Sequence, residues 1–355
     1  MNKLLISSAL LTVSTLATAQ SSVTLFGIVD TTFKRGSGST ASRTAIGSGG
    51  NSSSRLGFRG VEDLGGGMRA SFWLESGPNA DDGSGGTTNT SNQTTGTSGG
   101  GALTFGRRAT ISLGGAWGEL RLGRDYSVQY YNRFEFDPFG NNGVGSSQTN
   151  VGSLGGPVSS RVSNAIMYFL PPNLGGFYGE LQYYLGENAS HVGATADDGE
   201  GGGVRLGYRT GPLNVAAAHA RTQYARTATT GNISASNIAA RYQFGDFIAM
   251  GGYYRDTVDT IAGLTGRGLQ IGGTYRVGAG DIKLLLSNYK TTAAGNPETK
   301  KISLGYVHNV SKRTAVYSTF ARVQNSGGAT TALNNSVTGA NRSSSGLDIG
   351  VRHSF

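Results

Sequence analysis

The chain of 355 residues has no cysteine and only seven prolines. Without cysteine there are no disulfides and no thiolate metal centres, which is still compatible with an exported protein. The four histidines are dispersed without metal-ligand spacing. No phosphate cradle or dinucleotide fingerprint follows the glycine-rich stretches. We therefore expect no metal site, no cofactor and no enzymatic activity.

Long apolar runs are also missing once the first residues are set aside. Lys3, the apolar stretch 4–16 and the small residues 17–19 form an expected signal peptide over 1–19, followed by one mature domain, 20–355. No other segment approaches the roughly twenty apolar residues that a membrane-spanning helix needs. The sequence predicts an exported protein and excludes a helical membrane protein.

What the chain does contain is glycine, tyrosine and alternating segments. Its 59 glycines and 16 tyrosines favour β-structure with many turns. Apolar residues recur at every second position, for example Phe72 and Leu74, or Val162, Ile166 and Tyr168. Few segments are apolar on both faces, so little is left for the core of a β-sandwich.

The connections alternate between short and long. We count seven short turns and eight long polar stretches, which join sixteen strands and leave both termini at the short-turn end. This layout predicts an all-β fold, a transmembrane 16-stranded antiparallel β-barrel with short periplasmic turns and long external loops. The Gly/Thr-rich stretch 85–101 is interpreted as a loop within one domain, with a flexible interdomain linker as the alternative.

The formal net charge is +9, but the arginines are scattered singly through alternating strands, which argues against nucleic-acid binding. In a closed barrel, one parity of each strand faces lipid and the other faces a water-filled bore. Parity places Arg55, Arg108 and Arg161 in the bore, where fixed positive charge favours anions. The longest connection, 126–160, is the candidate for a loop that folds inward and narrows the bore.

Several segments together resemble the trimeric general-diffusion porins of Gram-negative outer membranes, especially their β-proteobacterial branch. The resemblance covers the whole mature chain. It rests on "SSVTLFGIVD" at the start, "SRLGFRGVEDLGGGMRASFWLE" (54–75), "GELRLGRDY" (118–126), "LGYVHNVSKRTAVYSTFA" (304–321) and the terminal "GVRHSF".

The resemblance implies an eyelet in which the inward-folded loop 126–160 faces a ladder of arginines. Arg55, Arg108 and Arg161 occupy the ladder positions, and Arg107 is the alternative to Arg108. The remaining candidates are acidic: Glu135 and Asp137 in the tip "FEFDPFG" (134–140), and Glu75, which resembles an acidic partner of the arginines.

The same resemblance implies a homotrimer in the outer membrane, in contact with outer-membrane lipids and lipopolysaccharide. It also implies that the strand ending at Phe355 is read by the barrel-assembly machinery, and that the loop 76–101 latches over a neighbouring subunit. We expect a passive, water-filled channel for small anionic or neutral hydrophilic solutes, selective for anions. The alternatives are a substrate-specific outer-membrane channel and a secreted β-rich adhesin or binding protein.

Overall fold

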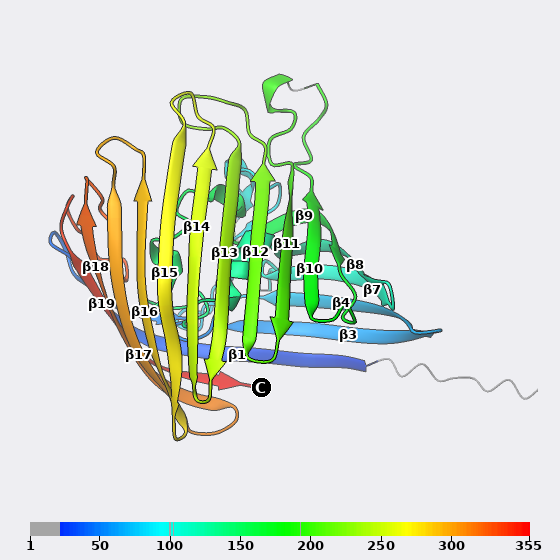
Figure 1. The fold of residues 1–355 in the computed structure, drawn as a ribbon, viewed down its shortest axis with the longest axis horizontal. Coiled ribbons are helices and arrows are strands. Elements are labelled where there is room, and N and C mark those ends of the chain that lie inside the picture. Colours follow the sequence, from blue (N-terminus) through cyan, green and yellow to red (C-terminus); the bar gives the residue numbers. More distant parts are fainter. Residues whose placement is uncertain (1–21, 99–100, 102, 192) are drawn as a thin grey trace, which may run out of the picture.

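The computed structural model describes residues 22–98, 101, 103–191 and 193–355. The expected signal peptide, 1–19, lies outside the described residues. Within them, seventeen strands form one antiparallel sheet, and a two-stranded ribbon of β5 (Thr88–Asn89) and β6 (Thr97–Ser98) lies apart from it. Figure 1 shows the long strands side by side, curving round an interior that holds the helical segments.

The seventeen strands of the sheet have the following bounds: β1 (Ser22–Ser37), β2 (Arg43–Ser48), β3 (Arg55–Gly65), β4 (Met68–Ser76), β7 (Arg108–Gly115), β8 (Gly118–Tyr126), β9 (Arg161–Phe169), β10 (Phe177–Tyr184), β11 (Gly201–Thr210), β12 (Leu213–Thr222), β13 (Ile233–Phe244), β14 (Phe247–Val258), β15 (Leu264–Val277), β16 (Gly280–Thr291), β17 (Glu298–Asn309), β18 (Thr314–Ser326) and β19 (Ser344–Ser354). Consecutive strands of the sheet pair with each other, except that β2 and β3 both pair with β1.

The first and last strands close the sheet into a barrel. β1 pairs with β19, and Gly27 and Phe355 exchange two backbone hydrogen bonds of 3.1 Å. On its other edge β1 pairs first with β3 and then with β2. β2 and β3 are therefore one barrel strand interrupted by residues 49–54, which we call the β2–β3 insert. The prediction of a closed 16-stranded barrel is confirmed.

Closure is a physical requirement because hydrocarbon offers no hydrogen-bond partner to an unpaired strand edge. The strand bounds also confirm the alternation of connections, with short turns after β3, β7, β9, β11, β13, β15 and β17. Both ends of the described chain lie at the short-turn end. The terminal strand is thus an interior member of the sheet and leaves no exposed edge.

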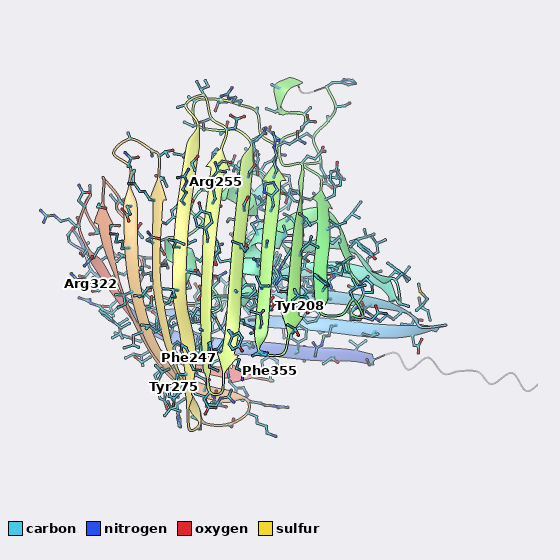
Figure 2. All side chains as sticks on the ribbon, in the orientation of Figure 1. Tyr208, Phe247, Arg255, Tyr275, Arg322 and Phe355 are labelled. Carbon is cyan, nitrogen blue, oxygen red and sulfur yellow. The ribbon has the colours of Figure 1, made fainter. Side chains whose placement is uncertain are left out.

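The two faces of the strands differ as the alternation predicts. On β15, Leu269, Ile271 and Tyr275 point outward and are at least half exposed, while Gln270 is buried against the interior. Figure 2 shows Phe247, Tyr275 and Phe355 near the short-turn end of the barrel. Outward aromatic side chains at this level form the girdle expected where a barrel meets the membrane interface.

One predicted apolar face is wrong at its start. Val162 is fully buried beside Val158, whereas Ile166 on the same strand is 47% exposed. The pairing of β8 with β9 shifts register between Gly123 and Asp125, and Asn164 has a φ of +56°. This β-bulge adds one residue and moves Val162 to the inner face.

Helical structure in the described residues comprises α1 (Val128–Glu135) and the short turns η1 (Thr94–Gly96), η2 (Ser147–Thr149), η3 (Gly156–Val158) and η4 (Gly193–Thr195). None of the described helices is long and apolar enough to cross a membrane. α1, η2 and η3 all belong to residues 127–160, between β8 and β9, which we call the inner loop.

Gly123 is a position where the barrel wall requires glycine. Its φ is +120°, and a Cβ there would lie 2.1 Å from the carbonyl oxygen of Ala109 on β7. We predict that Gly123→Ala lowers the stability of the barrel by about 1–3 kcal/mol through backbone strain, with the clash adding to this. The temperature at which the purified barrel loses its compact, unheated mobility in a detergent gel measures this.

Gly251→Ala on β14 is the matched control, because the nearest atom to its added Cβ is the Gln270 carbonyl oxygen at 3.6 Å. Equal unfolding temperatures for the two variants would contradict the strain at Gly123.

Candidate functional site

The inner loop begins at the extracellular end of β8 and packs its helix α1 on β12 and β13. The wall carries small alanine side chains at this place. Phe136, just after α1, is fully buried against Ala216 and Ala239. Asn132 Nδ2 donates a hydrogen bond to Asn237 Oδ1 at 2.6 Å. Small side chains on these two strands therefore make room for the loop, and amides hold it.

The rest of the inner loop continues along the wall as far as β19. Gln270 Nε2 on β15 donates to the Phe136 carbonyl oxygen at 2.9 Å, and Lys301 Nζ on β17 donates to the Ser146 carbonyl oxygen at 2.6 Å. The Val144 N–H donates to the carboxylate of Asp348 on β19 at 2.8 Å. The inner loop is thus attached to one half of the barrel wall, from β11 to β19.

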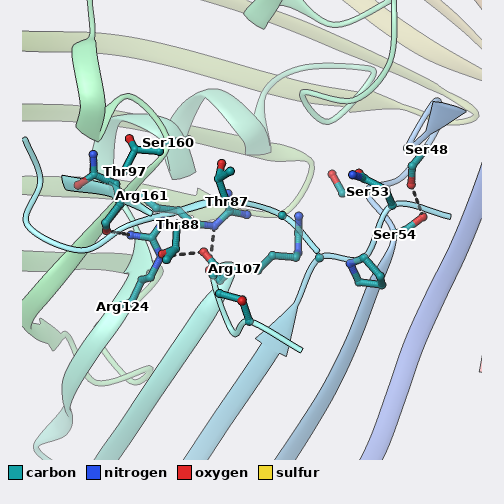
Figure 3. Close-up of a pocket in the computed structure, with 18 of the residues that line it drawn as sticks. Ser48, Ser53, Ser54, Thr87, Thr88, Thr97, Arg107, Arg124, Ser160 and Arg161 are labelled. Carbon is teal, nitrogen blue, oxygen red and sulfur yellow. Dashed lines mark hydrogen bonds between the residues drawn. The ribbon is translucent and has the colours of Figure 1, made fainter. Parts of the chain in front are cut away.

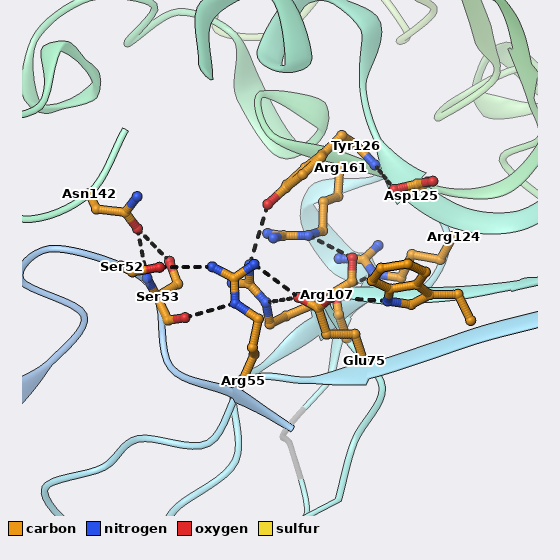
Figure 4. A network of polar contacts seen from close by, with 12 residues as sticks. Ser52, Ser53, Arg55, Glu75, Arg107, Arg124, Asp125, Tyr126, Asn142 and Arg161 are labelled. Carbon is orange, nitrogen blue, oxygen red and sulfur yellow. Dashed lines mark hydrogen bonds and ion pairs between the residues drawn. The ribbon is translucent and has the colours of Figure 1, made fainter. Parts of the chain in front are cut away.

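Arginines gather on the facing half of the wall. Arg107 Nε lies 2.6 Å from Glu75 Oε1, and Arg55 Nη1 lies 3.9 Å from the same oxygen. Arg161 Nε donates to the Arg107 carbonyl oxygen at 2.8 Å, and its guanidinium lies 4.6 Å from the ring centroid of Tyr126. Figure 4 shows Arg55, Arg107 and Arg161 converging around Glu75 and Tyr126. We call these three arginine side chains the arginine group.

Arg108 belongs to a neighbouring set of charges. Its Nε lies 3.3 Å from Asp125 Oδ2, and the Arg121 Nη1 lies 2.7 Å from the same oxygen. Arg121 also contacts Glu119 at 2.8 Å. The positive charges of this set are therefore largely matched by carboxylates.

The structure thus brings Arg107, and not Arg108, between Arg55 and Arg161. The inward and outward alternation along β7 favoured Arg108. It does not apply to Arg107, because Arg107 precedes the first residue of the strand. Burial alone lowers the pKa of the Arg107 guanidinium, but the Tyr126 hydroxyl and the Glu75 carboxylate raise it, and the net pKa lies above its ordinary value. Arg107 stays cationic.

Glu135, at the end of α1, is turned toward the wall that carries the inner loop. Its carboxylate forms an ion pair with Arg205 on β11, and Oε1 accepts a hydrogen bond of 2.6 Å from Arg209 Nη2. Asn214 Nδ2 donates to the same oxygen at 2.7 Å. The Glu135 carboxylate is therefore saturated by partners on β11 and β12.

Asp137 is buried inside the inner loop itself, with 4% of its surface exposed. Its carboxylate accepts hydrogen bonds from the Phe139 N–H at 2.7 Å and from the N–H and hydroxyl of Ser147 at 2.8 and 2.7 Å. These bonds tie the tip of the loop to its returning arm. Neither Asp137 nor Glu135 forms an ion pair with the arginine group among the described residues.

Two cavities flank the arginine group. One of about 780 Å³ lies between the inner loop and the second long loop (residues 77–107), and Figure 3 shows Arg107, Arg124 and Arg161 lining it together with Ser and Thr side chains. Among its described lining residues there is no carboxylate. The other, of about 460 Å³, has an excess of cations: Arg55, Arg107, Arg108, Arg121 and Arg205 against Glu75, Asp125 and Glu180.

The second long loop holds a residue that sequence reasoning missed. Asn92 is 1% exposed; its Nδ2 donates to the carbonyl oxygens of Ser163 and Leu185, both at 3.0 Å, and its Oδ1 accepts from the Ser163 N–H at 2.8 Å. The Tyr224 hydroxyl donates to its carbonyl oxygen. Asn92 therefore docks this part of the loop on its own barrel; the latch over a neighbouring subunit that the resemblance implies stays a prediction. No sequence signal pointed to this docking, because Asn92 is one of several asparagines in a polar, Thr/Ser-rich loop.

A closed antiparallel barrel with an apolar exterior, a charged interior and a loop folded into its bore defines an outer-membrane channel. The model of the Gram-negative porin family matches residues 7–328, and the chain belongs to this family.

Similar proteins agree with this assignment. The chain is 34% identical to outer membrane porin protein 32 of Delftia acidovorans and 28% identical to an outer membrane porin protein of Bordetella pertussis, in each case over the whole of both chains. The solved structure of an anion-selective porin from Comamonas acidovorans has a TM-score of 0.81 and 32% identity, covering 95% of this chain and 100% of that one. The chain is a porin of the outer membrane, a passive diffusion channel, as its sequence predicted.

The docking of Asn92 generates a prediction about the channel mouth. Asn92→Ala removes three buried hydrogen bonds, each worth about 1 kcal/mol. We expect the loop 77–107 to open locally and to be cut faster by a nonspecific protease in the folded, detergent-solubilised protein. The rate of cleavage within this loop is the measurement.

Asn296→Ala is the control, because Asn296 has a similar positive φ of +53° but lies exposed in the loop before β17. If both variants were cut at the rate of the unmodified protein, Asn92 would not hold the loop.

Proposed function

We propose that the channel prefers anions and that the arginine group forms the basic side of its constriction. One observation carries this proposal: the carboxylates of the inner loop, Glu135 and Asp137, are bound to other partners, while Glu75 alone pairs with Arg55 and Arg107, and Arg161 beside them forms no ion pair among the described residues. The net charge facing the bore at this level is therefore positive. The similarity to an anion-selective porin supports the same preference.

Aromatic rings stand beside the arginines: Tyr131 and Phe134 belong to α1 of the inner loop, and Tyr126 lies against Arg161. Tyr126, Tyr131 and Phe134 line the 460 Å³ cavity together with the arginines. Aromatic rings add no net charge that would cancel the positive wall, and water-excluding walls strengthen the field of the arginines. Small anions are thereby concentrated, while neutral hydrophilic solutes are limited by size alone.

Glu75 limits this preference and orients the group. Its Oε2 accepts a hydrogen bond from Trp73 Nε1 at 3.0 Å, and its Oε1 contacts Arg107 and Arg55. Removing a partner from a buried ion pair is costly, because the remaining charge is left without compensation. We infer that Glu75 offsets the repulsion between the guanidinium groups of Arg55 and Arg107 and aligns them, at the expense of one unit of positive charge.

We further infer, from the resemblance to trimeric porins, that the protein is a homotrimer and that the barrel-assembly machinery reads its terminal strand. The position of Phe355 supports the second point. It ends β19 with an exposed ring on the outward face, adjacent to Gly27 of β1, where the barrel closes.

The outer surface carries a feature that favours contact with lipopolysaccharide. Arg255 on β14 lies directly opposite Arg267 on β15, which lies directly opposite Lys290 on β16. All three are exposed and share the outward parity of Tyr253 and Leu269. Figure 2 shows Arg255 near the long-loop end of the barrel. We call these three basic residues the outer basic row.

Like charges directly opposite each other destabilise a β-sheet. No ion pair among the described residues includes a member of the outer basic row, so none of their carboxylates offsets this cost. Anionic lipid headgroups attract Lys and Arg at a membrane surface by about 1 kcal/mol per residue. We propose that phosphate groups of lipopolysaccharide bind across the row.

The selectivity proposal predicts the effect of Arg55→Gln, Arg107→Gln and Arg161→Gln combined. One unit charge about 7 Å from an ion contributes roughly 0.6 kcal/mol in water, close to a threefold change in ion concentration. We expect the anion-to-cation permeability ratio to fall severalfold. The reversal potential of single channels in a planar bilayer under a salt gradient measures it.

The control removes three charges from the outer face instead: Arg255→Gln, Arg267→Gln and Lys290→Gln. Its permeability ratio should match that of the unmodified channel. An unchanged ratio in the variant of the arginine group would refute the constriction role.

The same outer variant tests the lipid proposal. We expect it to lose at least tenfold in affinity for purified lipopolysaccharide, measured by native mass spectrometry of the detergent-solubilised protein. Enzymatic removal of the glycolipid phosphates should weaken binding to the unmodified protein equally. The outer basic row would be rejected as the site if the outer variant bound lipopolysaccharide with unchanged affinity. It would also be rejected if removal of the phosphates left the affinity of the unmodified protein unchanged.

A further inference from the structure

Asp30 on β1 is buried opposite the β2–β3 insert and has none of its surface exposed. Its carboxylate accepts hydrogen bonds from three consecutive backbone N–H groups, those of Gly50 at 3.3 Å, Asn51 at 3.0 Å and Ser52 at 2.6 Å. The hydroxyl of Tyr317 also donates to it. Converging consecutive N–H groups form an anion-binding concavity, and here the protein fills it with its own carboxylate. Asp30 therefore fixes the path of the insert.

The insert in turn holds Arg55. Arg55 Nε donates to the Ser53 carbonyl oxygen and Nη2 donates to the Ser52 hydroxyl, both at 3.1 Å. Figure 4 shows these two bonds on the side of Arg55 away from Glu75. The guanidinium is thus held between the insert and the carboxylate.

The insert also seats the inner loop. The N–H and hydroxyl of Ser53 donate to Asn142 Oδ1 at 2.9 and 2.7 Å. The next residue, Gly143, passes so close that a Cβ on it would lie 2.0 Å from the Gly50 carbonyl oxygen. Both sides of the constriction, Arg55 and the inner loop, meet on a segment whose shape depends on Asp30.

We propose that Asp30 is a positioning residue for ion selection, which acts by holding Arg55 and the inner loop through the β2–β3 insert. This inference rests on the proposed anion preference of the channel. Asp30 lies beside the bore without an ion-pair partner among the described residues. By charge alone, it opposes the entry of anions. By position, it supports the selection of anions, so the two roles predict shifts of opposite sign when Asp30 is replaced.

The experiment uses two variants with the same loss of charge. Asp30→Ala removes every acceptor for the insert, and we expect the anion-to-cation permeability ratio to fall toward that of Arg55→Gln. Asp30→Asn keeps one side-chain oxygen for the N–H groups of Asn51 and Ser52. We expect it to restore the ratio to at least the value of the unmodified channel. Reversal potentials of the full-length protein in planar bilayers measure both.

Asp256→Ala on β14 is the matched control, because Asp256 is also buried and also accepts a hydrogen bond from a tyrosine, Tyr289, at 2.5 Å. It makes no hydrogen bond to the insert, so its loss should leave the ratio unchanged or shift it toward anions. In the Arg55→Gln background, Asp30→Ala should shift the permeability ratio toward cations by less than it does in the unmodified protein, because Arg55 is already removed.

The proposal is overturned by a shift toward anions in Asp30→Ala, by equal ratios for Asp30→Ala and Asp30→Asn, or by an unreduced cation shift in the Arg55→Gln background. Should Asp30→Ala fail to fold, Ser52→Ala combined with Ser53→Ala tests the next link, from the insert to Arg55 and Asn142, because it removes two hydroxyl hydrogen bonds without a change of charge. An unchanged ratio in that variant would reject positioning through the insert. A shifted ratio in Arg55→Gln with none in Asp30→Ala rejects the positioning role alone. An unshifted ratio in Arg55→Gln counts against the proposed function as well.

Discussion

The docking of the inner loop on one half of the barrel wall is the interaction on which the bore depends. Alanines on β12 and β13 leave room for Phe136, and side chains from β13 to β19 hydrogen-bond the loop backbone and its amides. Because Glu135 is bound by Arg205 and Arg209 in this docking, the loop brings no unpaired carboxylate to the facing wall. The unpaired positive charge there consequently comes from the arginine group and not from the loop.

Pairing, rather than the number of charges, decides what an ion meets in this bore. Arg108 and Arg121 share Asp125 and Glu119, and such a set acts as a cluster of dipoles whose field decays quickly. The arginine group has one carboxylate for three cations. A formal net charge of +9 for the whole chain therefore says less about selection than the local imbalance around Glu75.

Much of the fold was predictable, because a strand that crosses a bilayer must alternate and must close on a neighbour. That logic yields the closed barrel and the turn pattern. It fails where the alternation is interrupted: Val162 lies before a bulge, and Arg107 lies before its strand begins. Family resemblance pointed to Glu135 and Asp137, but which partners bind a carboxylate depends on contacts between distant strands. Asn92 is likewise visible only once the loop is folded back on β9 and β10.

Period-two alternation also lets one strand carry two unrelated charge patterns. On β14, Arg255 belongs to the outer basic row, while the next residue, Asp256, is buried inside and hydrogen-bonded to Tyr289. A register slip by one residue would exchange the outer and inner faces of a strand. The strand pairing must therefore be fixed wherever outward and inward charges both have a role. The β2–β3 insert is a place where the pairing is relaxed, and it is there that Asp30 supplies fixed hydrogen bonds in place of the ladder. In this barrel, a buried carboxylate thus replaces the lost strand pairing where an irregular segment lies beside Arg55.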